Sequence, residues 1–76
     1  MLFYFEIDGV VNSNVFAKQW EIQRSLNDWP VFDFTWHGNA LQVRTNSGNV
    51  PEAELRKMLN LALGHQGRRL IDGITL

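Results

Sequence analysis

The side chains best suited to chemistry gather around a central stretch of the chain, residues 31–46. There His37 follows Asp33 by four residues, and a histidine held by a carboxylate is a common general base. In an extended strand, however, four residues span about 13 Å, which is too far for the two groups to share a proton. The spacing therefore predicts a solvated histidine beside a turn, and we assign no catalytic residue.

A second set of charged residues, Glu6, Asp33 and Arg44, is expected on neighbouring strands of one sheet. Arg44 should lie on a strand that adjoins both other strands, so these three side chains could form a charged cluster. Surface ion pairs of this kind usually contribute less than about 1 kcal/mol to stability. The cluster is therefore interpreted as surface decoration.

Motifs for metals, nucleotides and cofactors are absent from the sequence. There is no cysteine, which excludes thiolate metal sites, disulfides and cysteine nucleophiles. The two histidines, His37 and His65, are far apart in the sequence, and no HExxH, GxxxxGK[ST] or GxGxxG pattern occurs. We therefore expect no metal, no cofactor and no enzymatic activity.

The composition is that of one small folded domain. The 76 residues are 45% hydrophobic, with three Trp and five Phe, which is enough apolar surface for one core. The formal net charge is −1, whereas nucleic-acid-binding proteins usually carry a basic excess. The apolar N-terminus is interrupted by Glu6 and Asp8, which predicts neither a signal peptide nor a membrane span. We expect a single α+β domain over residues 1–76, located in the cytoplasm.

The central stretch has the pattern of a β-hairpin with Gly38 and Asn39 as a two-residue turn. Placing His37 opposite Ala40 fixes the register of the two strands. This register brings apolar pairs to one face of the hairpin and polar pairs to the other. The apolar pairs are Trp36–Leu41 and Phe34–Val43, and the polar pairs are Thr35–Gln42 and Asp33–Arg44.

Strands and helices are expected on both sides of the hairpin. Alternation predicts a strand over residues 2–7, and the spacing of apolar residues predicts a helix over residues 13–28. A second helix should follow the hairpin, capped by Asn49 and ended by Gly64. Residues 68–75 are expected to form the last strand.

This order of elements predicts a ferredoxin-like βαββαβ fold, with both helices on one face of a four-stranded sheet of order 4-1-3-2. The second strand is then an edge of the sheet, where another strand can pair. The face under the helices should carry Phe3, Phe5, Ile7, Phe32, Phe34, Trp36, Leu41 and Val43. The open face should carry Tyr4, Glu6, Asp33, Thr35, His37, Gln42 and Arg44.

The first helix has two candidate faces for packing. Phe16 and Trp20 lie well off its main apolar stripe, on the side that also carries Gln23. Two alternatives stay open for this pair. The rings pack sideways on the second helix, or they form an exposed aromatic surface that binds a protein. The stripe expected to pack on the sheet consists of Val15, Ile22, Leu26 and Trp29.

The sequence thus favours a small non-enzymatic module that binds another protein, as an adaptor, regulator or inhibitor, with a homodimer as one form of this. The candidate binding features are Phe16, Trp20 and Gln23 on the first helix, together with the edge strand. The alternative is a nucleic-acid-binding module that uses the open face and Arg68-Arg69. The element order matches RNA-recognition motifs, but those modules stack bases on aromatic residues of strands one and three, where this chain offers only Tyr4.

Overall fold

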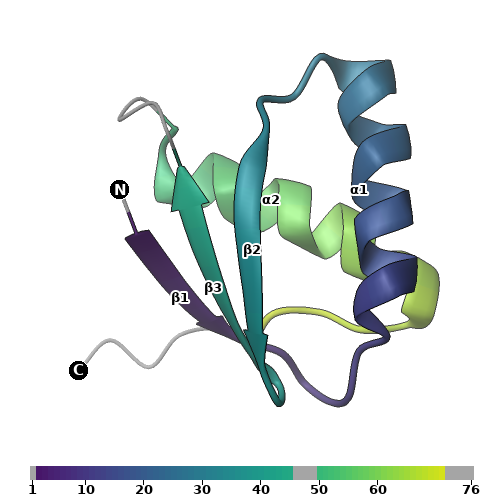
Figure 1. Cartoon of the computed structure of the whole chain (residues 1–76), viewed down its shortest axis with the longest axis vertical. Helices are drawn as coiled ribbons and strands as arrows, with labels where there is room; N and C mark the ends of the chain where they lie inside the picture. Colours follow the sequence, from purple (N-terminus) through teal and green to yellow (C-terminus); the bar gives the residue numbers. More distant parts are fainter. Residues whose placement is uncertain (1, 46–49, 72–76) are drawn as a thin grey trace.

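The computed structural model describes residues 2–45 and 50–71 of the chain. Within these residues, three strands form one antiparallel sheet, and there are also two helices and a short 3-10 turn (Figure 1). The protein is therefore of the α+β class. The elements are β1 (Leu2–Glu6), α1 (Ser13–Asn27), β2 (Phe32–His37), β3 (Ala40–Thr45), α2 (Glu52–Leu63) and the 3-10 turn η1 (Gly64–Gln66).

The hairpin formed by β2 and β3 has the register predicted from the sequence. Gly38 in its turn has a φ of 62°, which glycine adopts without strain. Strand β1 pairs antiparallel with the other side of β3, so the sheet order is β1-β3-β2. The Cα partners in the hairpin are Phe32–Thr45, Asp33–Arg44, Phe34–Val43, Thr35–Gln42, Trp36–Leu41 and His37–Ala40.

The four-stranded order 4-1-3-2 is not confirmed, because three strands are found in the described part of the chain. Residues 72–76 of the expected last strand lie outside the described residues. Before them, Leu70 forms an isolated antiparallel bridge with Ile7. Two backbone hydrogen bonds flank this bridge, from Asp8 N–H to Arg69 O (3.0 Å) and from Ile71 N–H to Glu6 O (2.9 Å).

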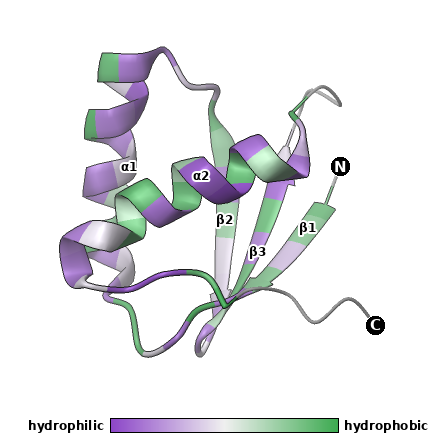
Figure 2. Cartoon of the chain, turned by 180° about the vertical axis from the view of Figure 1, so that it is seen from behind, coloured by the Kyte–Doolittle hydropathy of each residue, from purple (hydrophilic) through white to green (hydrophobic). Residues whose placement is uncertain are grey.

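The core lies between the sheet and the helices. Figure 1 shows α2 passing behind the sheet and α1 running alongside β2, and Figure 2 shows α2 across the strands from the other side. Alternation along each strand sends one set of side chains into this core and the other set to the open face. The buried core residues are Phe5, Ile7, Phe16, Trp20, Phe32, Leu41, Val43, Leu55, Leu59, Ala62, Leu63 and Leu70.

Helix α1 packs on the sheet through Phe16 and Trp20, which are only 1% and 3% exposed. Their rings meet the ring of Phe34 edge to face, with centroids 5.1 Å and 4.9 Å away respectively. Phe16 also meets Trp36 edge to face at 5.2 Å, and Trp20 lies 5.0 Å from Trp29. Edge-to-face contacts at these distances add to the stabilisation that burial of the rings provides.

The aliphatic stripe predicted to face the sheet is on the outer side of α1 instead, and that prediction is wrong. Val15 and Ile22 are exposed, and Leu26 is 75% exposed. Only Trp29, which follows the helix, packs against the core. The physical reason is the partner surface: aromatic side chains bury more area than aliphatic ones, and the hairpin offers aromatic partners.

The start of α1 is fixed by hydrogen bonds to both the side chain and the backbone of Asn12. The side-chain oxygen of Asn12 accepts hydrogen bonds from the backbone N–H groups of Asn14 and Val15. The Gln66 side chain, from η1, accepts from the Asn12 N–H (2.9 Å) and donates to the Asn12 carbonyl (3.1 Å). The helix ends before Asp28, which adopts a left-handed φ of 55°.

Helix α2 ends directly before Gly64, as predicted from the sequence. Asn49, the predicted cap, lies outside the described residues, and Pro51 at the N-terminal boundary makes no side-chain cap. Beyond η1, Gly67 has a φ of 69° and redirects the chain toward β1. The side chains that α2 buries are Leu55, Leu59, Ala62 and Leu63.

Candidate protein-binding site

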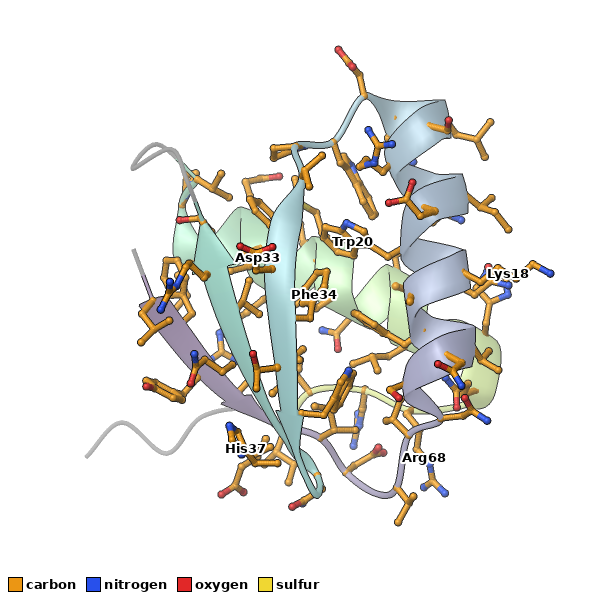
Figure 3. The ribbon with its side chains drawn as sticks, viewed as in Figure 1. Lys18, Trp20, Asp33, Phe34, His37 and Arg68 are labelled. Carbon is orange, nitrogen blue, oxygen red and sulfur yellow. The ribbon has the colours of Figure 1, made fainter. Side chains whose placement is uncertain are left out.

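Phe16 and Trp20 are inside the protein. One of the two alternatives from the sequence placed this aromatic pair at the surface. Figure 3 shows Trp20 directed from α1 toward Phe34 on β2. Gln23, the polar neighbour of the pair, is half-buried and accepts a hydrogen bond at Oε1 from Asn27 Nδ2 (3.1 Å). The expectation of an exposed aromatic surface is therefore wrong, because a partner would reach these rings only if α1 left the sheet.

The outer side of α1 carries the apolar row Val15, Ile22 and Leu26, which the helical spacing predicts to face the core. Scattered apolar side chains are common on protein surfaces and need no partner. Lys18 and Glu21 are exposed on the same helix. No neighbouring feature indicates what would cover the row, so we do not treat it as a site.

The open face of the sheet is ordered in cross-strand rows. Asp33 and Arg44 share a row, as expected, but Glu6 is in the row of Ala40. Glu6 stands opposite Ala40, which precedes Arg44 by four residues on β3, so about 13 Å separates Glu6 from Arg44. The three charged residues therefore do not form one cluster. The rows are Leu2–Arg44–Asp33, Tyr4–Gln42–Thr35 and Glu6–Ala40–His37.

The open face brings no acid–base pair together. Glu6 and His37 lie in one row, but Ala40 stands between them, and two strand spacings amount to about 10 Å. The ion pairs found among the described residues all lie within helices, as Arg24–Glu21, Arg56–Glu52 and Lys57–Glu54. Tyr4, at 68% exposure, is the aromatic residue most available on this face.

The two arginines of the nucleic-acid alternative, Arg68 and Arg69, lie in different surroundings. Figure 3 shows Arg68 at the end of the molecule where α1 begins, away from Asp33. Its guanidinium packs against Gly9, where an added Cβ would lie 2.5 Å from Arg68 Nη1. Arg69 is exposed, and its backbone N–H donates to the side chain of Asp8 (3.2 Å). Because Ile7 and Leu70 face the core, the neighbouring pair Asp8 and Arg69 lies on the open-face side, so Arg69 extends that face next to an acidic residue and Arg68 does not.

Two side-chain donors on α1, Trp20 Nε1 and Arg24 Nε, are buried and have no hydrogen-bond partner in the described part of the chain. Arg24 Nη2 donates to Glu21 Oε2 at 3.0 Å. This hydrogen bond, with the charge of the Glu21 carboxylate, raises the pKa of Arg24 further above its ordinary value. Arg24 is therefore cationic at any working pH and is paired with Glu21 of the same helix.

Strand β2 is an edge of the sheet, and β3 pairs with only one side of its backbone. In a hairpin with a two-residue turn, the residues that flank the turn exchange hydrogen bonds, and such pairs recur at every second residue. Here the flanking residues are His37 and Ala40. The intervening residues of β2 direct their N–H and C=O groups away from β3. These residues are Phe32, Phe34 and Trp36.

The free edge of β2 also has an apolar flank. Phe34 and Trp36 turn their side chains toward α1 and are half-buried there. On the open side, Asp33 and His37 are the only ionisable residues of the strand, and residues 32–37 contain no proline or lysine. Proline and charged residues, above all lysine, are common on natural sheet edges, where they prevent pairing with other chains. The edge of β2 is therefore chemically suited to pair with another strand.

Neither a metal-binding cluster nor a membrane-spanning helix is found among the described residues. No group of three or more His, Cys, Asp or Glu side chains lies together in a way that could hold a metal ion within residues 2–45 and 50–71. Neither described helix is long and apolar enough to cross a membrane. The free edge of β2 is thus the most specific candidate site in this part of the chain.

Comparison of the chain with protein-family models, with curated proteins and with solved structures finds no match. No relative therefore assigns a role to any residue. The position of β2 in the sheet, the direction of its backbone groups and its aromatic flank support the site at this edge.

Proposed function

We propose that the protein is a small non-enzymatic binding module, acting as an adaptor, regulator or inhibitor, whose partner adds a β-strand to the free edge of β2. The observation that carries this proposal is the unpaired side of β2, with Phe34 and Trp36 at its centre. Strand addition obtains affinity from backbone hydrogen bonds and selectivity from side chains at alternate positions. Both are available at this edge.

Two surfaces would recognise the added strand. Its backbone would pair with the outward N–H and C=O groups of Phe32, Phe34 and Trp36. Alternate side chains would face the aromatic layer on the α1 side, and the others would face Asp33 and Thr35 on the open side. A suitable partner segment is therefore extended, apolar at every second residue, and polar between them.

The four-stranded ferredoxin-like order 4-1-3-2 is part of the same proposal. The antiparallel pairing of residues 69–71 with residues 6–8 supports a last strand beside β1. With that edge occupied by the chain itself, β2 would be the single edge left for a partner. The cytoplasmic location expected from the sequence stays a prediction.

The direct test removes one outward N–H without changing a side chain. A chain of 76 residues is accessible to chemical synthesis, so the Phe34 amide can be N-methylated. Because this amide makes no bond to β3, the monomer should keep its melting temperature. Partner proteins captured from the source cell by the unmodified chain should be lost from the N-methylated chain.

Methylation of the Thr35 amide is the matched control, because that N–H points to β3 and its loss should lower the melting temperature. If the chain methylated at Phe34 captures the same partners as the unmodified chain, strand addition at β2 is not the mode of binding. Phe34 methylation that itself lowers the melting temperature would show that the amide is already in use within the monomer.

A further inference from the structure

The edge of β2 restricts how a second copy of this chain can pair with it. The outward backbone groups belong to Phe32, Phe34 and Trp36, at every second position. In an antiparallel ladder, hydrogen-bonded residues of one strand stand opposite hydrogen-bonded residues of the other. The same three residues of the second copy must therefore stand opposite these three, and only a few registers satisfy this condition.

The registers differ in how many outward groups they pair. With Phe34 of each copy on the twofold axis, Phe32 of one copy stands opposite Trp36 of the other, and all the outward groups are paired. With Asp33 on the axis, two carboxylates face each other and one outward residue of each copy lacks a strand partner. With Thr35 on the axis, one outward residue of each copy again faces the hairpin turn. The register centred on Phe34 is thus favoured.

The side chains on both faces are compatible with this register. On the open face, Asp33 of each copy stands opposite Thr35 of the other, so a hydroxyl donor faces a carboxylate acceptor twice. On the α1 side, Phe34 meets Phe34 and Phe32 meets Trp36, which extends the aromatic layer across the axis. Phe34 and Trp36 are half-buried in the single chain, and the second strand would cover them further.

We propose that two copies of this chain form a twofold-symmetric dimer by antiparallel pairing of their β2 strands, centred on Phe34. The sheets of the two copies then become one continuous sheet. This inference rests on the proposed function, since it names a second copy as the strand that the β2 edge accepts. A homodimer interface of this kind presents the same residues from both copies.

The test places opposite charges at Thr35. In the register centred on Phe34, Thr35→Asp sets two carboxylates opposite each other on both sides of the axis, whereas Thr35→Lys sets an ammonium opposite each Asp33. Sedimentation equilibrium from low to high micromolar concentration measures the dimer dissociation constant. We expect Thr35→Asp to raise this constant roughly tenfold or more, and Thr35→Lys to leave it equal or lower it.

The matched control is Tyr4→Asp, which adds the same charge to the same cross-strand row but on β1, two strands away. Its dissociation constant should stay within about twofold of that of the unmodified chain, and melting temperatures confirm that each variant folds. A chain that stays monomeric at all concentrations would overturn the dimer. The proposed function would then still be tested separately, by partner capture with the chain methylated at Phe34. A dimer weakened by both Thr35 variants, or by neither, would overturn the pairing centred on Phe34.

Discussion

The two outer strands of the sheet differ in what lies beside them. At the C-terminal end of β1, the chain returns and pairs its residues 69–71 with residues 6–8, so that Glu6 of β1 is bonded and Leu70 is buried. At the outer edge of β2, no described segment pairs with the strand. Both strands are nevertheless anchored from the helix side, β1 by Phe5 and β2 by Phe32, which are buried.

Packing and pairing are separate properties of an edge strand. The aromatic contacts of Phe16 and Trp20 hold β2 in place without occupying its outward backbone groups. The strand is therefore ordered before any partner arrives, and a partner strand bears little of the entropic cost of ordering it. An ordered, unpaired edge is what strand addition requires.

The largest expected effect comes from the aromatic support of β2. Trp20→Ala should lower the free energy of unfolding by about 3–5 kcal/mol, because it leaves a cavity among rings in the core. Urea titration measures this change. The control Leu26→Ala removes an exposed side chain from the outer face of the same helix and should change the stability by less than about 0.5 kcal/mol.

The returning segment at the C-terminal end of β1 should show a slightly smaller effect. Leu70→Ala truncates a buried side chain whose backbone N–H donates to Asn60 Oδ1 at 2.7 Å, and we expect a loss of about 2–4 kcal/mol. Ile71→Ala, at an exposed neighbouring position, is its control in the same urea titration. Equal losses for the two variants would mean that Leu70 does not anchor the segment to β1.

A smaller effect is expected at Gly67, which turns the chain toward β1. Its φ of 69° is costly for residues with a Cβ, although no atom lies within 4 Å of an added Cβ. Gly67→Ala should therefore cost about 1–2 kcal/mol through backbone strain alone. Gly64→Ala is the control, since Gly64 has a helical φ of −57° and similar free space. Thermal melts of the two variants should separate clearly.

The hairpin could be predicted from the sequence because its determinants are local. Alternation over residues 31–45 and the Gly38-Asn39 turn fix both the register and the faces, and the structure has the same pairs. The edge position of β2 followed from the element order. The open-face rows that separate Glu6 from Arg44 did not, because they depend on how β1 aligns with β3.

The orientation of α1 could not be obtained from helical periodicity. The sequence contains two competing faces, one with Val15, Ile22 and Leu26 and one with Phe16 and Trp20. The choice between them depends on Phe34 and its neighbours on β2, which the helix meets only in the folded chain.

The most direct test of the account is amide hydrogen exchange at the two edges, followed by NMR as the chain is concentrated. The amides of Asp8 and Ile71, which are bonded across the β1 edge, should be protected at every concentration. Those of Phe34 and Trp36 should exchange rapidly in dilute solution and become protected as a second strand pairs with β2. If Phe34 and Trp36 are protected in the dilute monomer, or if they stay unprotected both on concentration and with captured partners, the edge of β2 is not the binding site.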